Sequence, residues 1–177
     1  MKALSLTQPW ASLVAIGAKQ IETRSWSTPY RGTMAIHAAK KFPMNAKELV
    51  NSEPFHSSLS KIKPDQKGWR ILPAGAIVAV CELTAVHRIP RSNQHFARFD
   101  FPTQHRLASY PVVLPPLEWR DGFGHSHEFD FGDYTAGRYA WILTDVRALK
   151  EPIPCKGALS LWDVPSNVKS LIAEQLQ

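Results

Sequence analysis

The sequence lacks the features that define several large classes of protein. None of its apolar runs approaches the roughly 20 consecutive apolar residues that a membrane-spanning helix requires. Residues 1–5 lead directly into polar, proline-containing sequence rather than into the apolar core of a secretory signal. We therefore expect a protein that does not span a membrane and that works in the cytoplasm.

The motifs of several common enzymes are also missing. The chain contains no Gly-x-Ser-x-Gly, no phosphate-binding P-loop and no dinucleotide-binding glycine pattern. Its two cysteines, Cys81 and Cys155, do not have Cys-x-x-Cys spacing, and Cys81 lies in an apolar run, which favours a buried thiol over a disulfide or a zinc ligand. Nucleophile-elbow hydrolases, nucleotide triphosphatases and Rossmann enzymes are therefore not supported, and we expect no cofactor.

The length and composition are those of an ordinary folded domain. The chain has 177 residues, of which 44% are hydrophobic and 20% are charged. This balance disfavours wholesale disorder, collagen-like repeats and coiled coils, and the length fits one domain. We expect residues 1–177 to form a single domain with a real core.

Positive charge is concentrated at the start of the chain. The net charge is +6, from 21 Lys and Arg against 15 Asp and Glu, and residues 1–50 hold seven of the bases but only two of the acids. Such an excess is typical of proteins that bind polyanions. A solvated, lysine-rich surface would give the same count, so charge alone does not decide the partner.

Residue patterns predict a mixture of helices and strands. Apolar residues recur at helical spacing over 8–16, where Pro9 suits the first turn and Gly17 supplies the stop. Helices are also expected over 44–60 and, with one apolar face, over 166–176. Strands are expected where β-branched and aromatic residues gather between glycines and prolines, at 21–26, 33–39, 76–86, 139–146 and 158–164.

One strand carries information about the sheet. Residues 76–81 are apolar on both alternating faces, which is typical of a strand covered on both sides. We therefore predict an α+β fold built on a small barrel. Residues 88–137, with five prolines and many aromatics and histidines, are expected to be a long, partly irregular excursion.

Ionisable groups converge just after the first predicted helix, in the segment Gly17-x-Lys19-x-x-Glu22-x-Arg24. On an extended strand Glu22 and Arg24 point to the same face, and Lys19 in the preceding turn can swing toward them. Such a group can bind a polar ligand. It can also be an ordinary ion pair on a wet sheet face, which would contribute little.

This segment closely resembles the signature of ASCH domains, a branch of the PUA-like superfamily. The resemblance extends to both ends of the chain, through Leu4-Ser5-Leu6-x-Gln8-Pro9-Trp10-Ala11, Tyr30-Arg31-Gly32, Ile36-His37-Ala38, Gly137-Arg138-Tyr139-Ala140-Trp141, Lys156-Gly157 and Leu161-Trp162. It does not cover residues 88–130. It implies a PUA-like β-barrel with flanking helices and a cleft beside the signature, in a superfamily most often associated with RNA or modified nucleotides.

The leading hypothesis is a module that binds RNA, another single-stranded nucleic acid or a nucleoside in a basic cleft. Lysine and arginine side chains would contact phosphate or a base carbonyl, a carboxylate or amide would meet a base edge, and aromatic rings would stack on bases, although each ring could equally be core. The candidate ligand-binding residues are Gln8, Trp10, Lys19, Glu22, Arg24, Trp26, His37, Tyr139 and Trp141.

A small hydrolase is the competing hypothesis, so we leave open whether the chain is an enzyme. Some ASCH-like proteins hydrolyse the amide of N4-acetylcytidine with a lysine, a nearby threonine and a glutamate from a later strand, and Lys19 and Glu82 resemble two of these parts. The threonine position, three after the lysine, is Glu22 here, and Thr23 is one residue too late. Lys19 with Glu22 or Glu82 could still activate a water. Ribonuclease activity is also associated with some members.

Glu82 is notable because its strand is otherwise mostly apolar. A buried carboxylate needs a cation, and Lys19 or Arg24 is the expected partner unless Glu82 reaches water at the rim of the barrel.

The histidines His125 and His127, with Glu128, Asp130 and Asp133, include possible metal ligands, but a solvent-exposed loop is the simpler interpretation and we predict no metal site. A third interpretation, an interaction domain with a vestigial cleft, also fits the sequence.

Overall fold

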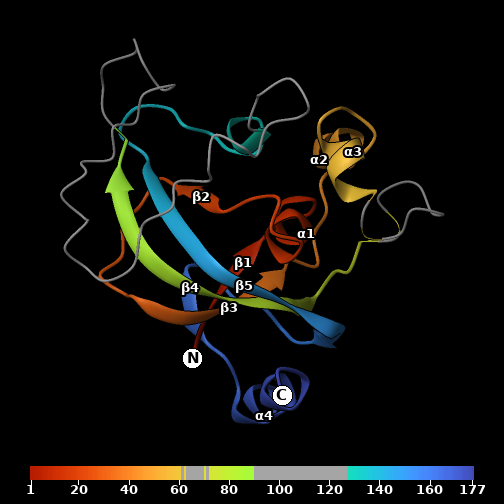
Figure 1. Ribbon diagram of the computed structural model, residues 1–177, viewed down its shortest axis with the longest axis vertical. Coiled ribbons are helices and arrows are strands. Elements are labelled where there is room, and N and C mark those ends of the chain that lie inside the picture. Colours follow the sequence, from red (N-terminus) through yellow and green to blue (C-terminus); the bar gives the residue numbers. More distant parts are fainter. Residues whose placement is uncertain (61, 63–69, 71, 90–126) are drawn as a thin grey trace.

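A computed structural model describes residues 1–60, 62, 70, 72–89 and 127–177, and Figure 1 shows its arrangement. The helices are α1 (Trp10–Ala15), α2 (Met44–Leu49), α3 (Phe55–Leu59) and α4 (Ser166–Gln175), with a 3-10 turn η4 (His127–Phe129). The strands are β1 (Lys2–Leu6), β2 (Ile21–Arg24), β3 (Gly32–Ala38), β4 (Ala76–Arg88), β5 (Tyr139–Pro154) and β6 (Leu161–Asp163). None of the described helices is long and apolar enough to cross a membrane.

The six strands form one mixed sheet in the order β2-β5-β4-β3-β1-β6. β1 pairs with β3 in parallel, and the other neighbours are antiparallel. The sheet curls strongly (Figure 1). As a result, Arg24 of β2 reaches β1, where its Nη2 donates a hydrogen bond of 2.9 Å to the Ser5 carbonyl oxygen. The predicted α+β class is confirmed, with a curled half-barrel and flanking helices.

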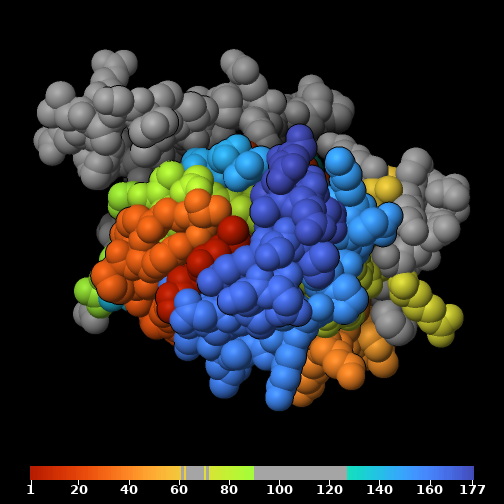
Figure 2. Space-filling view, turned by 90° about the horizontal axis from the view of Figure 1, so that it is seen from below, coloured from red at the N-terminus to blue at the C-terminus, as the bar shows by residue number. Residues whose placement is uncertain are grey.

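Both faces of the sheet are covered. Helix α1 packs on the inner face, where Val14 meets a core that includes Cys81 and Trp141. Helix α4 crosses the outer face, where Val168 and other apolar residues of the helix cover Ile77, Val80 and their neighbours (Figure 2). The expectation that residues 76–81 lie in a doubly covered strand is therefore confirmed. Burial raises the pKa of the Cys81 thiol to about 12, and the thiol is free.

A separate apolar cluster forms the wall beside the inner face. Leu13 of α1, Val50, Phe55 and Leu59 of the α2–α3 region and Phe131 after η4 are all buried together. The Phe55 ring meets Phe131 edge-on at 5.0 Å between centroids. These contacts fix where the short helices and the chain after η4 stand relative to β1 and β2.

Three features of the fold differ from the expectations. Strand β1 was not predicted, because its alternation runs over only five residues and its partner β3 lies far along the chain. Strand β5 continues beyond 139–146, since a positive φ of 46° at Asp145 and a register shift produce a bulge rather than an end. The helix expected over 44–60 is two helices, because Pro54 cannot continue a helix begun before it.

Of the predicted excursion over 88–137, residues 90–126 lie outside the described part of the chain.

Candidate functional site

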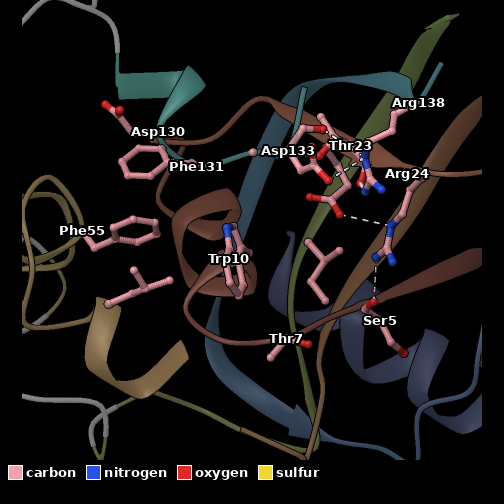
Figure 3. A pocket seen from close by; sticks show the side chains of 14 residues that line it. Ser5, Thr7, Trp10, Thr23, Arg24, Phe55, Asp130, Phe131, Asp133 and Arg138 are labelled. Atoms are coloured by element: carbon pink, nitrogen blue, oxygen red, sulfur yellow. Dashed lines mark hydrogen bonds and ion pairs between the residues drawn. The ribbon is translucent and has the colours of Figure 1, made fainter. Parts of the chain in front are cut away.

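A cavity of about 460 Å³ opens between the curled sheet, the wall of short helices and the segment that follows η4 (Figure 3). We call it the signature pocket, because Glu22 and Arg24 lie on its lining. Figure 3 shows Trp10 standing between Phe55 and Phe131 on one side and the contact of Arg24 with Ser5 on the other. The lining residues are Ser5, Leu6, Thr7, Trp10, Glu22, Thr23, Arg24, Leu49, Phe55, Asp130, Phe131, Gly132, Asp133 and Arg138.

Lys19 lies beneath the signature pocket and does not line it. Gly17, at a φ of +74°, ends α1, and the Lys19 side chain turns inward with none of its surface exposed. Its ammonium donates a hydrogen bond to the Ile21 carbonyl oxygen and lies 3.7 Å from both Glu22 Oε2 and Glu128 Oε1. Lys19 therefore joins two carboxylates from distant parts of the chain, which is a structural position and not an exposed contact for a ligand.

Glu128 completes this buried charge cluster, a role that the sequence analysis did not predict. Its carboxylate accepts hydrogen bonds from the backbone N–H groups of Gln20, at 2.7 Å, and Ile21, at 3.1 Å, and its residue is only 4% exposed. Burial raises the pKa of the Glu128 carboxyl, and the nearby Lys19 ammonium and the two backbone donors oppose this rise. The segment after η4 is thus fastened to the start of β2.

Glu22 and Arg24 share one face of β2, as their spacing predicts. The sheet register places them opposite Trp141 and Tyr139 of β5, respectively. Arg24 Nε lies 3.1 Å from Glu22 Oε1, so this carboxylate stands between the guanidinium and Lys19. The side chain of Arg24 keeps 26% of its surface exposed, toward the signature pocket. These two residues can present a charged donor and an acceptor side by side.

A second ion pair, which sequence reasoning missed, closes the other edge of the pocket. Arg138 Nε lies 3.3 Å from Asp133 Oδ2, and its Nη2 donates to the Thr23 carbonyl oxygen at 3.2 Å. The Asp133 N–H donates to Thr23 Oγ1 at 3.1 Å. Hydrogen bonds from Thr135 hold the pKa of Asp133 below its ordinary value. Arg138 lies in the run Gly137-Arg138-Tyr139 that carries the resemblance, whereas Asp133 was considered only as a possible metal ligand and not as a partner of Arg138.

The described part of the signature pocket is mixed in charge, which differs from the expectation of a basic cleft at this point. Its described lining residues contribute two guanidinium groups, from Arg24 and Arg138, and three carboxylates, from Glu22, Asp130 and Asp133. Each guanidinium is already engaged by a carboxylate. The described lining therefore offers oriented donors and acceptors but no excess of positive charge.

The other candidates near the signature occupy different surroundings. Gln8 is fully buried; its Nε2 donates to the Pro73 carbonyl oxygen at 2.7 Å and its Oε1 accepts from the Ser12 N–H at 3.1 Å. Both ends of this amide are thus engaged within the fold. Trp10 lies on the pocket lining and meets Phe55 edge-on at 6.3 Å between ring centroids.

The remaining aromatic candidates, Trp26, Tyr139 and Trp141, belong to the inner core of the sheet or pack against it. Trp141 is 0% exposed, and Trp26 meets it edge-on at 4.7 Å between centroids. Tyr139 packs against the same inner core. None of these three residues lines the signature pocket. A fully buried ring has no free face for a base, so the expected stacking on Trp141 is not available in this arrangement.

Glu82 and His37 lie away from the signature pocket. Glu82 pairs with Thr33 and Val80 pairs with Ala35, and Val80 and Ala35 belong to the outer cluster, so Glu82 lies on the outer face of β4. Its carboxylate accepts a hydrogen bond from the Thr33 hydroxyl. Glu82 therefore does not pair with Lys19 or Arg24, and it is only partly buried, as the alternative of a carboxylate that reaches water allows. His37 is buried in β3 and borders a second cavity.

Across the described residues, no group of three or more His, Cys, Asp or Glu side chains is placed to hold a metal ion. Within the candidate metal loop, His127 Nδ1 lies 3.1 Å from Asp130 Oδ2, while Glu128 turns inward. His125 lies outside the described residues.

Comparisons with known proteins agree with the resemblance seen in the sequence. The family model described as "ASCH domain" matches residues 4–153. Activating signal cointegrator 1 of Homo sapiens and that of Mus musculus are each 55% identical over 167 residues, or 93% of this chain, which spans only 22% of their length. A crystal structure of ASCH from Zymomonas mobilis aligns over 97% of this chain and 93% of its own, at 14% identity and a TM-score of 0.49. The chain belongs to the ASCH domain family.

Proposed function

We propose that the chain binds single-stranded nucleic acid and that the signature pocket receives one unstacked nucleotide, with either a plain or a modified base. Membership of the ASCH family supports this, because the PUA-like superfamily is associated with RNA. The observation that carries the proposal is the pocket itself: a cavity of about 460 Å³ with an aromatic wall on one side and oriented polar groups on the other. Cavities of this size hold small organic ligands.

The polar side of the pocket suits the edge of a base. A base presents hydrogen-bond donors and acceptors close together, and a protein reads an unstacked base by meeting both kinds of group. Glu22 supplies an acceptor beside the Arg24 donor, and Asp133 stands beside Arg138 in the same way. Because each charged group is held by a partner of opposite sign, its direction is fixed before a ligand arrives.

The aromatic side of the pocket suits the face of a base. Trp10 is partly exposed on the lining and is braced edge-on by Phe55, so its indole can be a stacking surface. Three carboxylates on the lining disfavour a phosphate at the same place, because like charges repel at short range. We therefore assign the base to the pocket and leave the backbone of the strand outside it.

The placement of Lys19 supports binding over hydrolysis. A hydrolase of the kind considered above needs the lysine ammonium to reach a substrate, and here the ammonium is enclosed between two carboxylates and a carbonyl oxygen. Glu82, the other proposed proton-transfer group, lies on the opposite face of the sheet from the pocket. A bound nucleotide would thus meet positioned groups rather than an exposed lysine.

The test is fluorescence anisotropy with a labelled single-stranded RNA, comparing the wild-type chain with Trp10→Ala and with Trp10→Phe as the matched control. Loss of one base stack costs about 1–3 kcal/mol, so we expect Trp10→Ala to weaken Kd by about 5- to 150-fold and Trp10→Phe to retain most of the affinity.

Equal affinity in the wild type, Trp10→Ala and Arg24→Gln, with all three folded by circular dichroism, would refute the assignment of the pocket. Incubation with N4-acetylcytidine, followed by chromatography, tests the hydrolase hypothesis directly. Turnover by the wild type would replace the binding proposal with the enzymatic one.

A further inference from the structure

A second cavity, of about 570 Å³, lies at the ends of β3 and β5, and we call it the lysine groove. Ser5 borders both cavities: its carbonyl oxygen accepts the Arg24 hydrogen bond at the signature pocket, and its hydroxyl lies 3.2 Å from His37 Nδ1 in the groove. The groove is lined by Ser5, His37, Ala39, Lys40, Lys41, Gly75, Cys155, Lys156, Gly157, Ala158 and Leu159.

The charge of the lysine groove has one sign. Lys40 and Lys41 follow β3, Lys156 follows β5, and all three are exposed. No carboxylate is among the described residues that line the groove. Over the described chain none of the three ammonium groups forms an ion pair, in contrast to the guanidinium groups of the signature pocket. A concave surface with charge of one sign attracts ligands of the opposite sign from a distance.

Backbone contacts hold the walls of the groove together. The Gly75 N–H donates to the Ala38 carbonyl oxygen at 2.8 Å, and the Cys155 N–H donates to the Gly75 carbonyl oxygen at 3.0 Å. Gly75 adopts a φ of +66°, which an L side chain rarely adopts. The turn before β4 thus ties the Lys40 segment to the chain that carries Lys156. The three lysines are therefore attached to backbone segments that these hydrogen bonds hold in place.

The floor of the groove is His37. His37 as a whole residue is 2% exposed, and its Nε2 lies 3.0 Å from the Cys155 carbonyl oxygen. Gly157 lies directly against this ring, and a Cβ at Gly157 would collide with it. Burial lowers the pKa of His37, so its imidazole is neutral at pH 7 and the positive charge of the groove comes from the lysines.

We propose that the lysine groove binds the phosphodiester backbone of a single-stranded nucleic acid, beside the nucleotide held in the signature pocket. This inference rests on the proposed function for the identity of the polyanion. Unpaired lysines are point charges that suit phosphates without reading the base. Ser5 lines both cavities, its carbonyl oxygen at the pocket and its hydroxyl in the groove, so the two sites are neighbours. The proposal therefore requires a strand with one base in the pocket to bring its adjacent phosphates around Ser5 to the groove.

The test is the salt dependence of binding, again by fluorescence anisotropy of a labelled single-stranded RNA. Each phosphate contact to a single strand adds about 0.7 to the slope of log Kd against log salt concentration, so replacing all three groove lysines by glutamine should flatten the slope by about 2. The matched control is Arg147→Gln with Lys150→Gln and Lys169→Gln, which removes the same charge from β5 and α4 outside the groove. This control should keep the wild-type slope.

Equal flattening of the slope in both triple variants, or no flattening in either, would overturn the inference. Thermal denaturation checks that each variant is folded.

An abasic strand of the same length separates this inference from the proposed function. We expect the abasic strand to lose the contribution of Trp10 but to keep its sensitivity to the groove variants. If the groove variants change the slope while Trp10→Ala does not change the affinity, the proposal for the lysine groove is supported and the assignment of the signature pocket is refuted. If Trp10→Ala weakens binding while the groove variants behave like their control, the assignment of the signature pocket is supported and the proposal for the lysine groove is refuted.

Discussion

The signature pocket and the lysine groove share Ser5, yet in the part of the chain that the structure describes the cations of the pocket are paired with carboxylates and those of the groove are not. Among the described residues in and beneath the pocket, every cation is paired: Lys19 lies between Glu22 and Glu128, Arg24 lies beside Glu22, and Arg138 lies beside Asp133. In the groove, the described lining residues include three exposed lysines and no carboxylate.

The contrast separates two uses of a positive charge. A buried cation between carboxylates is expensive to desolvate, and its benefit is a fixed geometry for the groups around it. An exposed lysine loses little solvation, contributes little to folding and keeps its field available to a partner. The signature Gly17-x-Lys19-x-x-Glu22-x-Arg24 therefore combines a lysine that organises the site with an arginine that faces it. Residue type alone does not show which lysine does which.

The largest expected effect is on stability, at Lys19. Lys19→Ala would leave the carboxylates of Glu22 and Glu128 facing each other without their shared cation. Removing one partner from a buried charge cluster costs about 3–5 kcal/mol, so we expect the free energy of unfolding to fall by this amount. Urea denaturation followed by circular dichroism measures it.

Lys40→Ala is the matched control for the comparison. An exposed lysine of the groove should change the free energy of unfolding by no more than about 0.5 kcal/mol. If the two variants lost similar stability, the distinction between an organising lysine and an available one would be wrong.

A smaller effect is expected at Glu128. Glu128→Gln keeps one oxygen to accept from the Gln20 or Ile21 N–H but removes the charge next to Lys19. The loss of a charged hydrogen-bonding partner in a buried place costs about 1–3 kcal/mol. Because Lys19 retains Glu22, we expect less destabilisation than in Lys19→Ala.

A double-mutant cycle with Lys19→Met sharpens this result. If Lys19 and Glu128 act as one unit, the double variant Lys19→Met with Glu128→Gln should be more stable than the sum of the single losses by about 0.5 kcal/mol or more. If the two losses of unfolding free energy simply add, the ion pair at 3.7 Å between Lys19 and Glu128 does not contribute to stability.

Glu128 also shows which parts of the site could be predicted from the sequence and which could not. Strands β2, β3 and β4 follow from local runs of β-branched and aromatic residues between glycines and prolines, and the structure has them. The shared face of Glu22 and Arg24 follows from their spacing of two on a strand. The partner of Lys19 lies 109 positions away, in a segment that the resemblance did not cover, and no local period relates the two. The sequence analysis assigned Glu128 to a candidate metal loop, because a sequence shows the type of a residue but not where its side chain points.

The same limit applies to the aromatic residues. Trp10, Trp26, Tyr139 and Trp141 all have the chemistry of a stacking surface, and sequence alone gave no reason to rank them. Burial separates them in the structure: Trp141 is enclosed by the inner core, whereas Trp10 reaches the pocket lining. Whether a ring is a core residue or a platform depends on which elements pack over it, and that is decided by long-range contacts.

The smallest expected effect is a pH dependence of stability at His37. Burial lowers its pKa in the folded protein below the ordinary value of 6.5, while the unfolded chain takes up a proton near that value. Below about pH 6.5 the unfolded state therefore binds more protons, and stability falls as the pH falls until the folded-state pKa is reached. Each unit of lowered pKa corresponds to about 1.4 kcal/mol.

Thermal denaturation at pH 7.5 and pH 5.5 measures this loss, and the part due to His37 is the part that His37→Gln removes. His56→Gln, at a partly exposed histidine of α3, is the matched histidine substitution outside the groove. The result also bears on the lysine groove. If His37 stays neutral, the salt slope of RNA binding is the same at pH 7.5 and pH 6.5, because the lysines alone supply the charge. A slope that steepens at pH 6.5 would instead make the buried histidine a fourth cation of the groove, and the division between enclosed and available charge would no longer hold there.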